Sequence, residues 1–428
     1  MAGETLTSAG TRSWLYHPVF PDHWQRRALY SLAQWVNGLA FRDIQFSPTG
    51  KPVIKIAEIK GGISGQTKFT EQVFDEPVHV RAGDLLFSWS GQPETSIDVF
   101  WWRGSDGWLN QHSFRVTPVE GVDPAFFFYL LRYLKPSFVG IARNKQTTGL
   151  GHVTKRDLEN IEAAYPSLPE QRAIAHILGT LDDKVELNRR MNETLETMAQ
   201  ALFKSWFVDF DPVRAKAEGR DTGLPRHIAD LFPDSFEDSE LGKIPRGWGV
   251  GSLDSVLVLQ RGFDLPATQR TSGAYPVLAA SGPSGTHNEF MVRGPGVTTG
   301  RSGVLGKVFY VHDDFWPLNT SLWVKEFRHS RPAYAFHLLL GIDFALFNAG
   351  SAVPTLNRNH VHNLPTLRPP MGLIDEFERV STESLDRQKL NDDQSRTLAA
   401  LRDMLLPKLV SGELRVQDAE RFIGERVA

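Results

Sequence analysis

The stretch Pro124-Ala-Phe-Phe-Phe-Tyr-Leu-Leu131 returns 208 positions later as Pro332-Ala-Tyr-Ala-Phe-His-Leu-Leu339. Each version begins with Pro, which is favoured at the first position of a helix, and continues as a short apolar run. We therefore predict a short apolar helix at residues 124–133 and another at residues 332–340. Because the second stretch repeats the first, the chain is expected to contain one structural unit twice.

Matches on both sides extend this repeat over most of the chain. Upstream the offset is 224, and the paired residues are Pro21/Pro245, Trp24/Trp248, Leu29/Leu253, Gly38/Gly262, Pro52/Pro276 and Val53/Val277. Downstream it settles at 203, with the pairs Asn160/Asn363, Pro166/Pro369 and Leu195/Leu398. An offset that only shrinks is expected when the second copy has lost loop residues. Units of about 200 residues are too long for solenoid or propeller repeats, so we predict two large domains.

The composition indicates a folded protein without thiol chemistry. Of 428 residues, 41% are hydrophobic, and 27 Phe and 11 Trp suffice for sizeable cores. The sequence has no Cys, which excludes disulfides, thiolate metal sites and cysteine nucleophiles. The N-terminus does not resemble a signal peptide, and the longest apolar run, residues 125–131, is far shorter than a membrane span. We therefore expect a cytoplasmic protein with no membrane partner.

The charge distribution permits a nucleic-acid partner but does not establish one. The formal net charge is −3, yet residues 241–370 hold 12 Lys and Arg against 7 Asp and Glu. DNA affinity depends on local clusters of positive charge and not on the balance of the whole chain. The net charge therefore does not exclude DNA binding.

Each copy is predicted to be a mixed α/β globule followed by a long helix. Runs at residues 51–57, 84–89 and 306–311 have the length and the β-branched or aromatic content of strands. The short apolar helix, a loop rich in Gly and Ser, and a long helical segment come next. The predicted boundaries are a first domain at 1–165, a first long helix at 166–212, a connector at 213–244, a second domain at 245–369, a second long helix at 370–412 and a tail at 413–428.

The long segments carry the heptad spacing of a coiled coil. In the first, residues alternately four and three apart form one seam: Ile174, Leu178, Leu181, Val185, Asn188, Asn192, Leu195, Ala199, Leu202 and Trp206. Residues 170–206 would form a helix roughly 55 Å long at about 1.5 Å per residue. The second segment keeps a seven-residue stripe: Phe377, Ser384, Asn391, Leu398 and Leu405. We predict that the two helices pair as an antiparallel coiled coil.

An Asn stands at the same seam position in both helices, Asn188 in the first and Asn391 in the second. A buried Asn is costly unless it is paired, and a paired one can fix the register of two helices. We predict that role here, with an incidental Asn on a core or surface helix as the alternative. Ser381, Ser384, Arg387 and Gln388 make the front half of the second helix polar, and that face could meet water or protein.

Three stretches add a family resemblance to this order of parts. They are Leu168-Pro-Glu-Gln-Arg-Ala-Ile-Ala175, Leu202-Phe-Lys-Ser-Trp-Phe-Val-Asp-Phe-Asp-Pro212 and Gly242-Lys-Ile-Pro-Arg-Gly-Trp248. With two α/β domains, each followed by a long helix, the chain resembles the specificity subunit of type I restriction-modification systems over nearly its whole length. The polar front half of the second helix departs from the family pattern.

The resemblance implies a function and a set of partners. Each α/β domain would be a target recognition domain that reads one part of a bipartite, asymmetric double-stranded DNA target. The helices would form a spacer that scaffolds modification (methyltransferase) subunits, expected to number two, and restriction/translocase subunits. S-adenosylmethionine, ATP and magnesium would bind those partners, and this chain would hold no cofactor and catalyse no reaction.

The residues themselves show no convincing methyltransferase or nuclease motif. Asp123-Pro-Ala-Phe126 is nearest to an adenine methyltransferase loop, but Asp-Pro before an apolar run is an ordinary helix start. Asp43 with Glu58-Ile-Lys60 fits a nuclease motif formally, although strand-edge charges often produce such triplets and the second copy has no equivalent.

Nucleotide and metal motifs are equally weak. Gly300-Arg-Ser-Gly-Val-Leu-Gly-Lys307 has five residues between its outer glycines, and Val308 stands where a phosphate loop needs Ser or Thr. His360-Val-His362 could reach a metal from a strand, but no Cys or carboxylate accompanies it nearby. We therefore predict no catalytic and no metal-binding residue in this chain.

Candidate DNA contacts are loop residues of the types that position phosphates and read bases. In the first copy they are Lys60, Ser64, Gln66, Lys68, Asn144, Lys145, Thr147, Thr148, Lys155 and Arg156, and in the second they are Arg301, Ser302, Lys307, Asn357 and Arg358. Solvated loop residues with no ligand are the alternative for any of them. Two other functions remain open: a stand-alone DNA-modifying or DNA-cutting enzyme with two recognition domains, and a two-headed protein-interaction adaptor.

Overall fold

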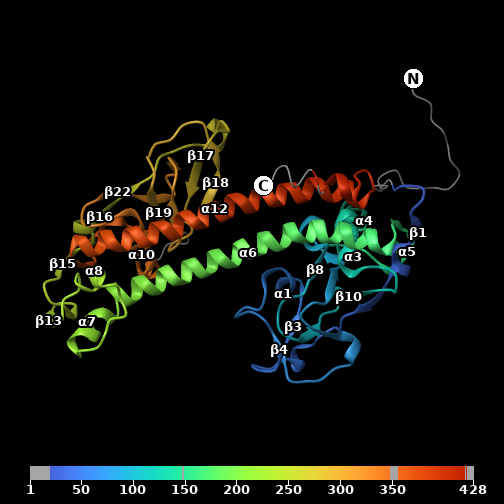
Figure 1. Cartoon of the computed structure of the whole chain (residues 1–428), viewed down its shortest axis with the longest axis horizontal. Coiled ribbons are helices and arrows are strands. Elements are labelled where there is room, and N and C mark those ends of the chain that lie inside the picture. The colour runs from blue at the N-terminus through green and yellow to red at the C-terminus, as the bar shows by residue number, and fades with distance from the viewer. Residues whose placement is uncertain (1–19, 147–148, 348–354, 420, 422–428) are drawn as a thin grey trace. The chain divides into compact units, whose positions relative to one another are not determined.

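The computed structural model describes residues 20–146, 149–347, 355–419 and 421 (Figure 1). The chain divides into two compact units, the first formed by Met1–Glu186 with Ser395–Ala428 and the second by Leu187–Gln394. Each unit therefore contains an α/β domain and a part of both long helices. No described helix is long and apolar enough to cross a membrane.

The first unit is built on two four-stranded sheets. One is antiparallel, in the order β2 (Ala33–Asn37), β10 (Ser113–Pro118), β6 (Leu85–Ser88) and β8 (Asp98–Trp101). The other runs β4 (Phe69–Thr70), β3 (Lys51–Ile54), β9 (Gly107–Leu109) and β5 (His79–Val80), with β3 and β9 parallel. Two short antiparallel pairs complete it, β1 (Gln25–Ala28) with β12 (Glu162–Tyr165) and β7 (Ser90–Gly91) with β11 (Gly151–His152).

Among the residues that the structure describes, this unit has five short α-helices, and the apolar one lies in its core. They are α1 (Ile56–Gly61), α2 (Pro93–Ser96), α3 (Pro124–Tyr133), α4 (Lys135–Asn144) and α5 (Lys155–Asn160). The run Phe126–Leu131 of α3 is buried throughout. The helix predicted at 124–133 is confirmed, whereas the strand predicted at 51–57 ends at Ile54 because Lys55 caps the start of α1.

The second unit repeats this topology. Its antiparallel sheet runs β16 (Leu257–Arg261), β22 (Ser321–Phe327), β19 (Gly296–Gly300) and β20 (Val308–Val311). A second sheet runs β18 (Gly282–His287), β17 (Tyr275–Ala279) and β21 (Trp316–Pro317), and β15 (Gly249–Ser252) pairs with β23 (Pro365–Arg368). In the parallel pairs of the two units, Val53 lies opposite Trp108 and Val277 opposite Trp316. The sequence repeat is therefore a repeat of one fold.

The helices of the second unit differ more than its sheets. The predicted apolar helix is confirmed as α10 (Pro332–Leu340), and α9 (Leu253–Val256) and α11 (Arg358–His362) are short. The predicted connector, residues 213–244, includes most of α7 (Asp211–Ala217), α8 (Arg226–Ala229) and a hairpin of β13 (Phe236–Ser239) with β14 (Gly242–Pro245). Val213, Ile228 and Phe232 lie in the same apolar core as Trp248, so the connector is part of the second unit's folded structure.

One repeated glycine shows why the two copies share framework residues. The N–H groups of Gly38 and Gly262 donate to Ser113 and Ser321 at 3.1 Å each. A Cβ atom would lie 2.2 Å from the Asn110 carbonyl oxygen at Gly38 and 2.3 Å from the Leu318 carbonyl oxygen at Gly262. Both positions require glycine because another strand's backbone passes directly against them.

The long helices, α6 (Leu168–Phe207) and α12 (Met371–Val410), have 40 residues each and contact one another within both units. In the first unit, Leu178 and Leu181 share a core with Leu398 and Leu405. In the second, the Asn188 amide donates to the Asn391 carbonyl at 3.2 Å and to Gln394 at 2.9 Å. Both asparagines are only 2% exposed.

The polar front half of α12 packs against the second unit's own α/β domain. Ser381 is 1% exposed, and its hydroxyl lies 3.0 Å from Nε2 of His337 on α10. Glu378 accepts hydrogen bonds from the backbone N–H groups of Ala333 at 3.1 Å and Tyr334 at 3.0 Å. Glu378 satisfies N–H groups at the start of α10, and Ser381 contacts its last turn, so this face of α12 meets protein at these positions.

Candidate functional site

A backbone junction at the end of β6 gathers several of the predicted DNA-contact residues. The N–H of Trp89, which follows β6, donates to the His112 carbonyl at 3.2 Å, and the Trp89 carbonyl accepts from Val153 at 2.9 Å. These bonds hold the β7–β11 pair, in which His152 lies opposite Ser90. We call residues 88–91 with 151–154 the strand-end junction of the first unit.

The second unit has the same junction at residues 300–302 with 355–357. The Arg301 N–H donates to the Thr320 carbonyl at 2.8 Å, and the Arg301 carbonyl accepts from Leu356 at 2.8 Å. Ser302 forms a bridge with Thr355. Trp89 and Arg301 therefore occupy one backbone position in two copies of the fold, with different side chains.

Four of the ten predicted contacts of the first unit lie on α4 and α5, the helices beside its junction, or directly after α4. Lys155 and Arg156 are exposed in the first turn of α5, directly after the junction, and the Lys155 ammonium lies 4.8 Å from the Tyr30 ring centre. Asn144 ends α4, and its side chain donates to the Gly140 carbonyl at 2.8 Å. Thr147 and Thr148 lie outside the described residues.

Lys145 is already engaged inside the protein. Its ammonium donates to the Asp157 carboxylate at 2.6 Å, and Asp157 also accepts from the Thr154 N–H at 2.7 Å. Burial raises the pKa of Asp157, but the bonds from Lys145 and Thr154 outweigh it, so that the pKa lies below its usual range. This pair ties the end of α4 to the start of α5.

The predicted contacts of the second unit divide in the same way. Arg301 and Ser302 lie in the junction, and Asn357 caps α11 by accepting from the Asn359 N–H at 3.0 Å. Arg358 is the exposed first residue of α11. Lys307 is exposed in the loop between β19 and β20, and its carbonyl accepts from Gly300 at 3.3 Å.

The remaining predicted contacts lie in α1, which contains Lys60, and in the loop between α1 and β4. Lys60 donates to the Thr95 carbonyl at 2.9 Å, next to β7. Ser64, Gln66 and Lys68 are exposed in the same loop. Thr67 ties this loop to α1, because its buried hydroxyl donates to Glu58 at 3.1 Å.

The structure adds neighbours of Trp89 and Arg301 that the sequence analysis missed. The indole N–H of Trp89 donates to the Asn37 side chain at 2.9 Å, and the His112 ring centre lies 5.8 Å away. In the second unit, Arg301 Nη1 donates to the Asn319 carbonyl at 3.4 Å. The offset of 224 pairs Asn37 with Arg261, next to the framework glycines. The offset of 212 that pairs Trp89 with Arg301 also pairs Ser90-Gly91 with Ser302-Gly303, a short match that the sequence analysis did not use.

The residues with motif-like spacing serve as structural groups. Asp123 caps α3 by accepting from the N–H groups of Ala125 and Phe126 at 3.0 Å each, which confirms the helix start. Glu58 accepts from the Lys55 N–H at 3.0 Å in a capping box. The prediction that His360 and His362 lie on a strand is wrong, because both lie in helix α11, whose side-chain-capped start favours helix.

His362 and the Gly-rich stretch also have structural partners. His362 Nε2 accepts from the Leu259 N–H at 2.9 Å, and burial lowers its pKa. The stretch from Gly300 to Lys307 joins two antiparallel strands, β19 and β20, and opens no helix. A phosphate loop needs a following helix whose N–H groups face the phosphate, so this loop lacks that arrangement.

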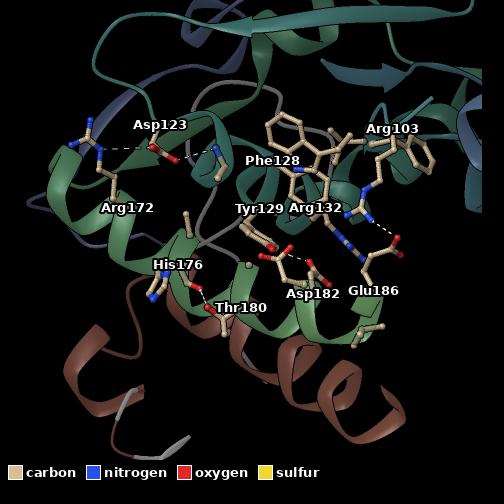
Figure 2. Close-up of a pocket in the computed structure, with 18 of the residues that line it drawn as sticks. Arg103, Asp123, Phe128, Tyr129, Arg132, Arg172, His176, Thr180, Asp182 and Glu186 are labelled. Atoms are coloured by element: carbon tan, nitrogen blue, oxygen red, sulfur yellow. Dashed lines mark hydrogen bonds and ion pairs between the residues drawn. The ribbon is translucent and has the colours of Figure 1, made fainter. Parts of the chain in front are cut away.

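A cavity of about 720 Å³ lies in the first unit between α3, β8 and the start of α6 (Figure 2). The Tyr129 hydroxyl donates to Asp182 at 2.8 Å across it. Burial, followed by the charge of Asp182, raises the pKa of Tyr129, so the phenol stays protonated. Two ion pairs flank this bond: Arg103 with Glu186 at 3.1 Å and Arg172 with Asp123 at 3.9 Å.

Both ion pairs return in the second unit with their charges exchanged. Lys389 pairs with Asp313 at 2.6 Å, and Lys389 is the helix residue equivalent to Glu186. Asp375, equivalent to Arg172, pairs with Arg331 at 2.9 Å. Each α/β domain is thus tied to its own helix by pairs of opposite polarity.

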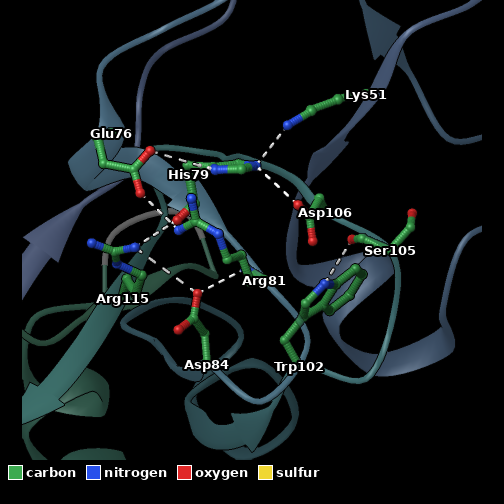
Figure 3. A network of polar contacts seen from close by, with 9 residues as sticks. All are labelled: Lys51, Glu76, His79, Arg81, Asp84, Trp102, Ser105, Asp106 and Arg115. Carbon is green, nitrogen blue, oxygen red and sulfur yellow. Dashed lines mark hydrogen bonds and ion pairs between the residues drawn. The ribbon is translucent and has the colours of Figure 1, made fainter.

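A second polar network in the first unit surrounds His79, which is 6% exposed (Figure 3). The Lys51 ammonium lies 2.8 Å from Nε2 of His79, and Asp106 lies 3.5 Å from the same nitrogen. Arg115 donates to the His79 carbonyl at 2.7 Å. In the second unit, His287 lies in β18, and the Thr271 backbone N–H donates to its Nδ1 at 3.1 Å. These contacts tie β3, β5 and β10 together and make this network structural.

Comparisons with known proteins find relatives of this chain and a solved structure with its fold. The family model described as "Type I restriction modification DNA specificity domain" matches residues 21–197. The type I restriction enzyme MjaIX specificity subunit of Methanocaldococcus jannaschii is 25% identical over 340 residues, covering 72% of this chain and 73% of its own. The HindI specificity subunit of Haemophilus influenzae is 25% identical over 406 residues, covering 78% of this chain and 87% of its own.

A solved structure shows the same fold. The S subunit of a type I restriction-modification system from M. genitalium has a TM-score of 0.57 at 16% identity, covering 92% of this chain and 99% of that one. The family match and the relatives show that this chain is similar to the specificity subunits of type I restriction-modification systems. Residues 21–197 therefore match a DNA specificity domain of the type I restriction-modification kind.

Proposed function

We propose that the two units read the two parts of a bipartite, asymmetric DNA target, one part each. The carrying observation is that both units share one hydrogen-bonded framework while their strand-end junctions present different side chains, Trp89 and Arg301. A shared frame places both readers against DNA in the same way, and different side chains at the frame's exposed end read different bases. The two elements of the target are therefore unlike.

The long helices act as the spacer between the readers, paired as an antiparallel coiled coil. Support comes from the order of contacts: Asn188 meets Asn391 and Gln394, whereas Asn192 meets Gln388 at 3.3 Å, earlier in α12. Asn391 donates to Asn192 at 2.8 Å, so the buried amides satisfy each other and would lose bonds in another register. Helices of 40 residues are roughly 60 Å long, longer than the roughly 34 to 36 Å of one DNA turn.

The chain serves as a non-catalytic scaffold in this proposal. Two modification subunits and the restriction/translocase subunits would supply S-adenosylmethionine, ATP and magnesium. The side chains with motif-like spacing, Glu58, Asp123 and His362, already bond to structural partners and are poorly placed to react. This weighs against a stand-alone enzyme.

Adenine methylation measured with and without modification subunits tests the proposal. The chain alone should bind duplex DNA weakly and transfer no methyl group, whereas the assembled complex should methylate one split sequence. Robust methylation by the isolated chain, lost in the Asp123→Asn variant, would favour the enzyme. Assembly with protein partners and no DNA binding at moderate salt would favour the adaptor.

A further inference from the structure

We propose that Trp89 and Arg301 are specificity-determining residues, that Arg301 reads a guanine in the element of the second unit, and that Trp89 makes an apolar contact, such as with a thymine methyl group, in the element of the first. The inference rests on the proposed function and names the side chains that carry it. It starts from a half-buried framework position at which the two copies carry side chains of different chemistry, Trp89 and Arg301.

The backbone at this position is the same in both units. Each residue directly follows the third strand of its sheet order, β6 or β19, and donates to the equivalent carbonyl, that of His112 or Thr320. Each accepts from the residue after the paired strand segment, Val153 or Leu356. Any difference in recognition between the two positions therefore comes from the side chain.

The Arg301 guanidinium is held but not neutralised. It makes one long hydrogen bond, 3.4 Å from Nη1 to the Asn319 carbonyl, and forms no ion pair with the residues that the structure describes. By contrast, Arg261 lies 3.8 Å from the carboxylate of Asp264. Arg301 thus keeps most of its donors for a ligand.

The support beneath Arg301 also limits its motion. The Asn319 side chain donates to the Asp264 carboxylate, and the Arg301 backbone is bonded on both sides. A guanidinium fixed at its base can donate two parallel hydrogen bonds to O6 and N7 of guanine, the commonest specific contact in the major groove. A lysine could replace the charge but not the paired donors.

Trp89 offers no free donor. Its indole N–H is already bonded to Asn37 at 2.9 Å, and its ring lies beside His112 and Phe114, with centres 5.8 and 5.9 Å away. The residue is half-buried, so the rest of its ring is apolar surface at the junction. Such a surface suits the thymine methyl group and rejects the bidentate pattern of guanine.

The test is a set of variants in the full chain, assembled with modification subunits. The variants are Arg301→Trp, Arg301→Lys and Trp89→Arg, and Arg358→Ala is the matched control because it removes an exposed cation beside the same junction. Binding to duplexes with every single base-pair change in each element, together with methylated-site maps, reports the specificity. The salt dependence of binding reports phosphate contacts.

Arg301→Trp and Arg301→Lys should each lose roughly 5- to 150-fold discrimination at one guanine of one element, the range expected for a bidentate contact. Trp89→Arg should change preference at one position of the other element. Arg358→Ala should weaken binding uniformly, with the salt slope lowered by about one.

Two outcomes separate failure of the inference from failure of the proposed function. If wild-type complexes methylate a split sequence and both Arg301 variants keep the wild-type preference at every base pair, Arg301 does not read bases and the inference is wrong. If wild-type complexes show no sequence preference, the proposed function fails as well. The Arg301→Lys variant keeps size and charge, so it remains informative if Arg301→Trp does not fold.

Discussion

At the scale of single residues, the repeated glycine gives the clearest stability prediction. A methyl group at Gly38 would lie 2.2 Å from the Asn110 carbonyl oxygen, a distance that real contacts do not reach. Gly38→Ala should therefore lower the free energy of unfolding by roughly 1 to 3 kcal/mol, as overpacking does. Gly61→Ala is the control, because nothing lies within 4 Å of a Cβ there. Equal thermal midpoints for the two variants would contradict this account.

The buried His337 gives a pH prediction. Burial lowers the pKa of His337 from 6.5 to about 4, whereas the unfolded chain titrates near 6.5. Since the unfolded state then binds more protons, stability is fully present above pH 6.5 and falls as the pH drops towards 4. The lost stability should be on the order of 3 kcal/mol in total. In the His337→Gln variant, the free energy of unfolding from denaturation curves should depend less on pH between 6.5 and 4. An unchanged pH dependence would refute the assignment.

At the scale of elements, the ion pairs between each α/β domain and its long helix have opposite polarity in the two units, and we expect them to favour the matching helix. Glu186→Lys would set its ammonium against Arg103, and Arg103→Asp in the same chain should restore the pair with the polarity of the second unit. The pairs are partly exposed, so the coupling should be about 0.5 to 1 kcal/mol and weaker in high salt. A double-mutant cycle measures it, and strictly additive effects would show that the pair contributes nothing.

Sequence alone predicts the elements that need the same residue types in both copies, because burial or close packing restricts those positions in the same way. Trp24 and Trp248 are both buried, and Gly38 and Gly262 face the same steric limit, so both copies keep them and the repeat is visible. The short apolar helices follow for the same reason. Asn188 and Asn391 were singled out because an amide in an apolar seam needs a partner.

Trp89 and Arg301 escape sequence analysis because their own residue types differ between the two copies, although the Ser-Gly that follows each is the same. Trp89 and Arg301 make the same backbone hydrogen bonds in their two units, and any residue type other than Pro can make such bonds. Lys145 was predicted as a DNA contact from its type, but its charge is opposed by Asp157, 12 residues away in sequence. The exchanged ion pairs are equally hidden, since a repeat search scores Glu186 against Lys389 as a mismatch.

At the scale of the whole molecule, the central claim is one fold with two independent readers. The most direct measurement is a map of methylated adenines made by the assembled complex, before and after residues 245–369 are replaced by the equivalent domain of another specificity subunit. Residues 1–165 stay untouched, so the account predicts that one element of the split target changes while the other element keeps its sequence. A continuous site, or a domain exchange that alters both elements, would contradict it.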